Sequence, residues 1–256
     1  MGANGVKHIR AVARAIDVLR CLAHADAALG VTDLERALTL SRPTLYRLLA
    51  TLEGKGMVRS FGEPRRFALD YPVVELAGGW LARNDVVPAA QPHLDRLWRA
   101  TDETVAMFIT ADSATKICVQ ELQSRQALVF TRGIGFSEPV TVGSSGSAIL
   151  AFMPPTEIDS VLDALPDDAA RAAKRRELAT VRANGYGATS GTIIAGAAAL
   201  AAPVFDRLGR VCASVSVFGP EARLRDAHRD DCIRQLLATA ADISAAIGYR
   251  GDAAAE

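Results

Sequence analysis

The sequence predicts an α+β protein with three parts: a winged helix-turn-helix over residues 1–70, a linker helix over 71–85, and a larger domain over 86–256 with a mainly antiparallel sheet. Three observations support this prediction. Three short amphipathic segments precede a basic hairpin, a separate apolar helical pattern follows Tyr71, and helical and strand-like segments then alternate to the C-terminus. The chain is long enough to bury a substantial core in one or two domains.

The first two helices are indicated by periodicity and by a capping pattern. Apolar residues recur at spacings of three or four, which predicts one face of a first helix, at Ile9, Val12, Ile16 and Leu19. Thr32 and Glu35 fit a capping box, because a threonine hydroxyl and a carboxylate three residues later can satisfy two free backbone N–H groups. A short second helix is therefore expected to begin near Thr32.

A third helix is predicted after Ser41, which suits the N-cap position, with Pro43 in the first turn where a missing N–H costs nothing. Its buried stripe is expected at Leu45, Leu48, Leu49 and Leu52, and glycines 54 and 56 end it. Two strands then follow at Met57–Phe61 and Arg66–Leu69, joined by a turn over residues 62–65.

The order of these segments is typical of a winged helix-turn-helix, whose third helix presents its N-terminal residues to the major groove of DNA. The distribution of charge along the chain agrees with DNA binding by the N-terminal part. Residues 1–83 carry 12 Lys and Arg against 8 Asp and Glu, whereas residues 84–256 carry 17 against 21. The alternative is a three-helix bundle with a solvated basic face. The candidate DNA contacts are Ser41, Arg42, Pro43, Thr44, Tyr46, Arg47 and the wing arginines Arg59, Arg65 and Arg66.

The linker helix is expected to begin at Pro72 and to end before Asn84. Its apolar face comprises Val73, Leu76, Ala77, Trp80 and Leu81. A face of this size requires a partner surface, which is either another subunit or the protein's own C-terminal domain.

The C-terminal domain is predicted from alternating helical and strand-like segments. Helices are expected at 92–100, 144–153, 157–165, 170–183 and 228–248. Strands are expected at 104–110, 116–121, 128–131, 186–189, 198–205 and 211–218, with residues 133–139 in a loop. Such a domain can hold a small molecule between its sheet and the connecting loops.

Several other classes of protein are disfavoured. The four cysteines form no CxxC pair and no metal-ligand spacing, so neither a metal nor a cofactor is expected. Residues 1–10 contain no signal-peptide core, and the apolar segment 193–205 is too short to span a bilayer, which predicts a soluble cytoplasmic protein without a membrane partner. The segment 143–147 lacks the final glycine of a nucleophile elbow, and no dinucleotide or phosphate-loop fingerprint is complete, so no catalytic residue is expected.

Three segments together resemble the IclR family of transcription regulators over nearly the whole chain. The first segment runs from VARAIDVLRCLA to LYRLLATLEGKGMV, the second is RGIGFSEPVTVGSSGSAILAF, and the third is ELATVRANGYGATSGTIIAGAAALAAPVFDRLGRVCASVSVFGP. The resemblance implies a GAF-like effector domain, dimerisation through the DNA-binding part, and tetramers formed as pairs of dimers. It also implies a small organic acid as effector and a double-stranded DNA operator with two related, palindromic half-sites.

The resemblance places the effector site at Gly143, Ser144, Ser145, Thr189, Ala199, Ser216 and Phe218. Backbone amides at Ser144 and Ser145 would meet a carboxylate, as the start of a helix favours. Thr189, Ala199 and Phe218 stand where sensors of very small acids carry acidic, thiol or hydroxyl groups. We therefore expect a larger, partly apolar carboxylate, for example a hydroxybenzoate, and control of a catabolic operon. The alternative is a small-molecule-binding or protein-interaction module whose winged helix does not bind DNA.

Overall fold

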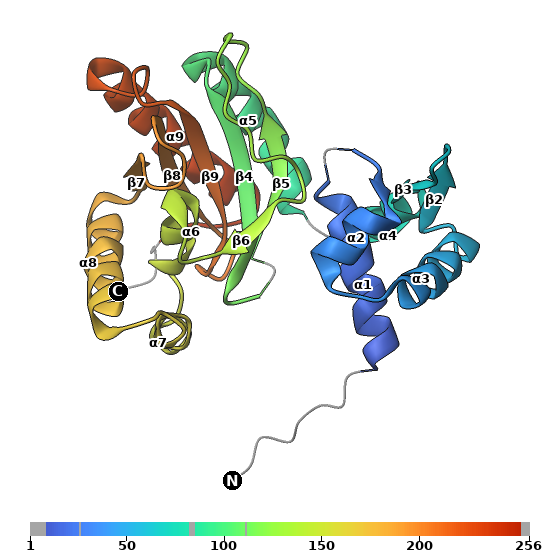
Figure 1. Ribbon diagram of the computed structural model, residues 1–256. Helices are drawn as coiled ribbons and strands as arrows, with labels where there is room; N and C mark the ends of the chain where they lie inside the picture. The colour runs from blue at the N-terminus through green and yellow to red at the C-terminus, as the bar shows by residue number, and fades with distance from the viewer. Residues whose placement is uncertain (1–8, 26, 82–84, 111, 252–256) are drawn as a thin grey trace. The chain divides into compact units, whose positions relative to one another are not determined.

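The computed structural model describes residues 9–25, 27–81, 85–110 and 112–251 (Figure 1). The chain divides into two compact units, residues 1–83 and residues 84–256. Each unit has its own hydrophobic core. Among the described residues, no helix is long and apolar enough to cross a membrane.

The N-terminal unit is a winged helix-turn-helix, as the sequence predicts. Its three strands form an antiparallel sheet in the order β1-β3-β2, in which β1 is a short addition that the sequence analysis did not anticipate. The elements are α1 (Arg10–Ala23), β1 (Leu29–Gly30), α2 (Val31–Leu38), α3 (Arg42–Gly54), β2 (Val58–Phe61), β3 (Arg66–Leu69) and α4 (Pro72–Leu81).

The core of this unit lies between the three helices and the inner side of the sheet. Leu45 and Leu49 are one helical turn apart on α3, and both are buried, together with Leu34 of α2, Val18 of α1 and Phe67 of β3. The predicted capping box is wrong. Gly30 is the N-cap of α2 and its N–H donates to Asp33 Oδ2 at 3.0 Å, so the acidic cap lies two residues before Glu35.

Only the C-terminal end of the apolar face predicted for α1 packs into the core of this unit. Leu19 is partly buried against that core, beside the buried Val18 and Leu22. Ile9, Val12 and Ile16 are exposed, because they lie on a part of the helix surface that no other element of the described chain covers. The helical periodicity was correct, but it does not distinguish a core face from a face left open.

The linker helix α4 also leaves apolar side chains uncovered. Val74, Leu76 and Trp80 are exposed. The sequence placed Leu81 on the same face and Asn84 beyond the end of the helix; the side chain of Leu81 and residue Asn84 lie outside the described residues. Two helices of the N-terminal unit therefore carry exposed apolar surface in the single chain.

The C-terminal unit is built on an antiparallel sheet in the order β6-β5-β4-β9-β8-β7, which confirms the predicted α+β class. Its elements are α5 (Val86–Thr101), β4 (Thr104–Thr110), β5 (Thr115–Leu122), β6 (Ser137–Pro139), α6 (Gly143–Leu150), α7 (Pro155–Asp163), α8 (Asp168–Asn184), β7 (Gly187–Ser190), β8 (Ala197–Phe205), β9 (Val211–Pro220) and α9 (Asp226–Ala246).

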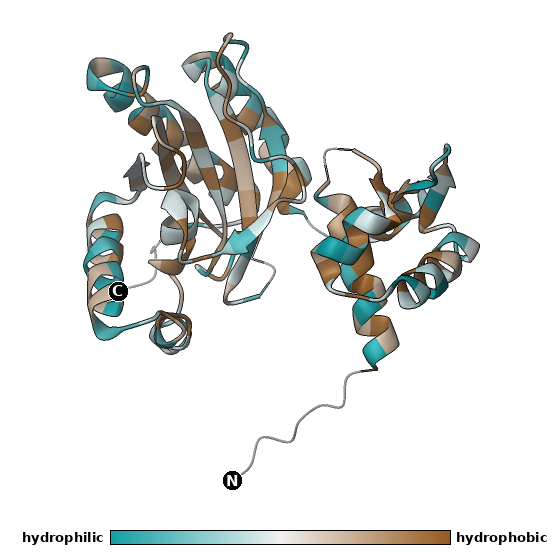
Figure 2. Ribbon diagram, viewed as in Figure 1, coloured by the Kyte–Doolittle hydropathy of each residue, from teal (hydrophilic) through white to brown (hydrophobic). Residues whose placement is uncertain are grey.

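The two faces of this sheet differ in chemistry. One face is apolar and packs against α5 and α9, with Met107, Leu200 and Val215 in its core (Figure 1). The other face contacts α6 and carries smaller or polar side chains from β9, among them Ser214 and Ser216. Brown apolar positions recur along β4, β8 and β9 in Figure 2. In β9 valines alternate with Ser214 and Ser216, because successive side chains point to opposite faces of a strand. The α6 face is therefore the one that has room for a cavity.

Two predicted segments of this unit differ from the structure. Residues 128–131 are not a strand, and two of their carbonyl groups accept hydrogen bonds from side chains instead of from a neighbouring strand. Arg223 donates to Leu128 O at 3.1 Å, and Thr104 donates to Phe130 O at 2.9 Å. Conversely, Ser137–Pro139, expected in a loop, forms β6 against β5. Helix α5 also begins before the predicted start, and Pro92 lies inside it.

The buried stripe of α3 provides a stability test. Replacing Leu49, which is 1% exposed, by alanine should lower the free energy of unfolding by about 2–5 kcal/mol, through lost burial and the cavity left behind. Tyr46→Ala on the exposed side of the same helix is the matched control, with an expected loss nearer 0.5 kcal/mol. Urea denaturation followed by circular dichroism measures both, and equal losses would contradict this packing.

Candidate functional site

The N-terminal part of α3 forms an exposed polar surface. Leu45 faces the core, which leaves Ser41, Arg42, Tyr46 and Arg47 on the outer side of the helix. The N-cap Ser41 has extended backbone, and its hydroxyl lies 2.9 Å from that of Thr44. Pro43 follows in the first helical turn. This end of α3 therefore presents hydroxyl and guanidinium donors together at a helix N-terminus, where anions are favoured.

The two arginines of this surface differ in their surroundings. Arg42 Nε donates to Glu35 Oε2 of α2 at 2.9 Å, and this hydrogen bond raises the pKa of the guanidinium. The guanidinium of Arg47 has no hydrogen-bond or ion-pair partner among the residues that the structure describes, and only its backbone carbonyl accepts a side-chain hydrogen bond, from Thr51. Arg42 is thus oriented by a neighbouring helix, whereas Arg47 is free to pair with an external acceptor.

The wing arginines are all exposed, but each has an internal contact. Arg59 lies over the ring of Phe61 with 5.6 Å to its centroid. Arg65 reaches Glu53 of α3 at 3.4 Å, and Arg66 donates to the carbonyl of Ala28 at 2.9 Å. Glu53 also accepts from the hydroxyl of Ser60 at 2.5 Å, so this carboxylate joins the wing to α3.

The C-terminal unit contains a cavity on the α6 side of its sheet. The space between its walls is about 560 Å³, its open mouth included. All seven positions proposed from the resemblance line this one cavity. They are Gly143, Ser144, Ser145, Thr189, Ala199, Ser216 and Phe218, and further lining comes from Phe108, Phe130, Thr131, Arg132, Glu138, Thr192, Ile193, Ile194, Ala197 and Ala198.

The first turn of α6 forms one end of the cavity, with Ser144 and Ser145 largely buried in its wall. The backbone N–H groups of a first helical turn have no partner within the helix and can bind an anion. Two glycines allow this turn to lie where it does. A side chain at Gly146 would overlap the backbone of Val140, and one at Gly187 would come within 2.9 Å of Ser144 O.

Ser216 on β9 provides an unsatisfied polar group in the cavity. Its side chain is buried and its Oγ has no hydrogen-bond partner in the described chain. On the neighbouring strands it is paired with Ala106 and Ala201, whose side chains offer no hydrogen-bond partner. Buried hydroxyls are normally hydrogen-bonded, so an orphan at a cavity wall indicates a place for a ligand atom.

The charged groups around the cavity leave one cation uncompensated. Glu138 is paired with Lys116 of β5, whose ammonium is fully buried, lies 2.5 Å from Glu138 Oε1 and also donates to Val142 O at 3.0 Å. Burial lowers the pKa of Lys116, while the hydrogen bond that Lys116 donates to the Glu138 carboxylate opposes that shift. Arg132 lies over the ring of Phe136, at 5.1 Å, and has no carboxylate partner within the described ranges.

Three charged residues at or beside the cavity were not among the site residues predicted from the sequence: Lys116, Arg132 and Glu138. Lys116 was placed inside a strand but nothing in its context marks it as buried. The side chain finds its partner across the β5–β6 pairing, since Lys116 and Glu138 are opposite each other. A pair formed by strand register becomes visible only when that register is known.

Comparison with known proteins gives the family. Residues 11–60 match the IclR helix-turn-helix domain, and residues 79–245 match the domain described as bacterial transcriptional regulator IclR C-terminal. The chain belongs to the IclR family. Its members are DNA-binding transcriptional regulators rather than enzymes, and they bind DNA and small-molecule effectors.

Relatives align with this IclR-family protein over almost its full length. It is 26% identical to the HTH-type transcriptional regulator KdgR of Escherichia coli K12, with 94% of each chain covered. It is also 26% identical to BhcR of Paracoccus denitrificans, over 99% of this chain and 92% of that one. The crystal structure of an IclR family transcriptional regulator from Brucella abortus superposes with a TM-score of 0.72 at 26% identity, covering 94% and 93% of the two chains.

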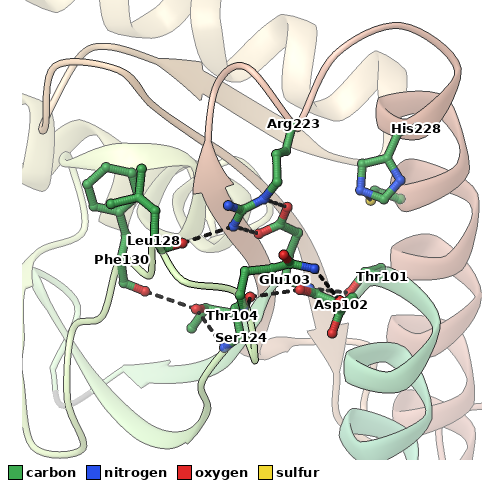
Figure 3. A network of polar contacts seen from close by, with 11 residues as sticks. Thr101, Asp102, Glu103, Thr104, Ser124, Leu128, Phe130, Arg223 and His228 are labelled. Carbon is green, nitrogen blue, oxygen red and sulfur yellow. Dashed lines mark hydrogen bonds and ion pairs between the residues drawn. The ribbon is translucent and has the colours of Figure 1, made fainter.

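In this IclR-family regulator, a buried ion pair supports the wall of the cavity that contains Phe130. Figure 3 shows Arg223 making two hydrogen bonds to Glu103, at 2.6 and 2.7 Å, while it also binds the carbonyl of Leu128. Thr104 holds the carbonyl of Phe130. Gly219 leaves space for the Glu103 carboxylate, which any side chain at that position would overlap.

The residues beyond Phe130 are held by a carboxylate of β5. Glu121 Oε2 of β5 accepts from the backbone N–H groups of Arg132 and Gly133, at 2.7 and 3.0 Å. The segment 128–133 is therefore fixed through four backbone groups although it belongs to no strand. We call this segment the strap.

The glycine contact of α6 can be tested directly. Gly146→Ala should destabilise the protein by about 1–3 kcal/mol, because its methyl group would overlap the Val140 carbonyl and the backbone cannot yield without cost. Gly54→Ala is the control, since nothing lies within 4 Å of the added group at that helical position. Thermal unfolding measures both variants. A Gly146→Ala protein as stable as the control would contradict the close approach.

Proposed function

We propose that this protein binds an operator through α3 and the wing, and that an organic acid bound in the C-terminal cavity changes that binding. The observation that carries the ligand part is the joint presence of free helix amides, an orphan serine hydroxyl and an uncompensated arginine around one cavity. Each of these groups can satisfy a carboxylate or a neighbouring oxygen, and none has an equivalent partner in the described chain.

The exposed end of α3 supports the proposed DNA contacts. Arginine can bind guanine edges or phosphate oxygens, and Ser41 and Thr44 can bind phosphate beside the helix N-terminus. Arg42 and Arg47 are the side chains that we assign to base or phosphate contacts from α3. Ser41, Pro43, Thr44, Tyr46, Arg59, Arg65 and Arg66 complete the proposed interface.

Exposed apolar surface supports assembly of the N-terminal unit as a dimer. Ile9, Val12 and Ile16 of α1 and its N-terminal flank are uncovered, as are Leu76 and Trp80 of α4. Helix faces of this kind are normally buried against a partner. A dimer places two equal winged helices in two-fold relation, so we expect an operator with two palindromic half-sites. We propose that any tetramer is formed from two such dimers.

The walls of the cavity support an acid with an apolar body. Phe108, Phe130, Phe218 and Ile193 line the same cavity as the polar groups, and the methyl side chain of Ala199 offers no hydrogen bond. An aromatic acid such as a hydroxybenzoate matches this combination better than a very small oxoacid. Acids of this kind are growth substrates, and for this reason we propose control of a catabolic operon.

The DNA contacts can be tested with single substitutions. Arg42→Ala and Arg47→Ala should each weaken binding to the intergenic region upstream of the protein's own gene by roughly 10- to 100-fold, the value of one specific arginine contact. Arg176→Ala, on the exposed surface of α8, is the control and should leave binding unchanged. A mobility-shift assay measures affinity, with circular dichroism to verify folding. Affinity that does not fall as salt rises would contradict phosphate contact, because neutralised phosphates release counterions.

The ligand site can be tested with two matched serines of β9. Both Ser214 and Ser216 have buried hydroxyls that find no partner among the described residues, but only Ser216 lines the cavity. Ser216→Ala should weaken binding of 4-hydroxybenzoate by roughly 10-fold, the value of one hydrogen bond of about 1.4 kcal/mol, whereas Ser214→Ala should have no effect. Calorimetric titration measures both. Binding of glyoxylate or pyruvate without binding of any aromatic acid would overturn the proposed ligand class.

A further inference from the structure

We infer that the ligand carries two anionic groups, and that Arg132 is the specificity-determining residue for the second of them. This inference rests on the organic-acid function proposed above and narrows its ligand class to dianions. The first anionic group is the one assigned to the amides of α6. Three features support it: the position of Arg132, the groups around its guanidinium, and the cavity wall that it shares with α6.

Arg132 and the first turn of α6 belong to different elements. The strap holds Arg132 through its backbone to Glu121 of β5. The first turn of α6 lies against β7, where Ser144 O closely approaches Gly187, and the N-cap of this helix, Val142, accepts a hydrogen bond from Lys116 of β5. The two donor groups therefore reach the same cavity from different elements.

The guanidinium of Arg132 is held in place but not neutralised. It lies over the ring of Phe136, which fixes its plane without satisfying its N–H donors. The other charged residue of the cavity wall, Glu138, is already paired with Lys116 at 2.5 Å. An arginine whose guanidinium N–H groups are unpaired at a cavity wall is suited to a carboxylate, because it can donate two parallel hydrogen bonds to the two carboxylate oxygens.

The same cavity also has an apolar part to its wall. Phe108 of β4, Phe218 of β9 and Ala199 of β8 line it, together with the hydroxyl of Ser216. A monoacid would leave either the α6 amides or Arg132 without an anion. A diacid with an apolar body would satisfy both, and Ser216 Oγ would remain available to one of its oxygens. The complementary ligand is thus an apolar spacer with an acid at each end.

Matched pairs of acids test this inference on the full-length protein. Each pair shares one apolar body: benzoate with terephthalate, and hexanoate with adipate. The wild-type protein should bind the diacid of at least one pair about 10-fold or more tightly than its monoacid, because a paired charge at Arg132 is added only by the diacid. Calorimetric titration at constant ionic strength gives the affinities.

Substitution of Arg132 should remove this preference selectively. Arg132→Gln should weaken diacid binding about 10-fold and change monoacid binding less than about 3-fold, whereas Arg132→Lys, which keeps the charge, should restore part of the preference. Arg176→Gln is the control on α8. Thermal unfolding of each variant verifies that the strap is intact.

The possible failures are distinguishable. Equal wild-type affinity for monoacid and diacid, or equal weakening of both by Arg132→Gln, would overturn the dianion inference and leave the proposed acid site standing. Wild-type protein that binds no acid of either pair and no 4-hydroxybenzoate would overturn both the inference and the ligand class on which it rests.

Discussion

The cavity of the C-terminal unit depends on the close approach of α6 to the backbone around it. Gly146 lies against Val140 and Gly187 lies against Ser144, at separations that no side chain would permit. This contact brings the first turn of α6 down to the sheet, so that its amides form one end of the cavity. The hydrogen bonds from Ser147 Oγ to Gly143 O and to Glu177 then hold the same turn from the side of α8.

Polar groups around the cavity divide into those that build it and those that stay available. Glu103 with Arg223, and Glu121 with the strap, are fully engaged in holding the wall that contains Phe130. Lys116 is engaged with Glu138. Ser216 and Arg132 have no comparable partner. Because the paired groups hold the wall of the cavity, little of the binding free energy has to be spent on ordering that wall.

The N-terminal unit shows the same division on its surface. Glu53 and Glu35 are acidic residues beside a surface proposed to meet phosphate, and each is occupied by an internal partner, Ser60 with Arg65 in one case and Arg42 in the other. These carboxylates orient basic side chains instead of standing as free negative charges. The exposed apolar residues of α1 and α4 lie elsewhere on the unit, which is consistent with separate surfaces for assembly and for DNA.

The amino-acid sequence by itself determined most of the helices and strands, because periodicity, caps and turn residues are local. Through the resemblance to a family it also selected Ser144 and Ser216, which the structure places at one cavity. It could not show that Ile9, Val12 and Ile16 remain uncovered, since an amphipathic pattern is the same for a core face and for an interface. Only the tertiary structure paired Lys116 with Glu138, turned residues 128–131 into a strap, and left Arg132 without a partner. Those features arise from strand register and from contacts between residues far apart in the chain, which no local pattern encodes.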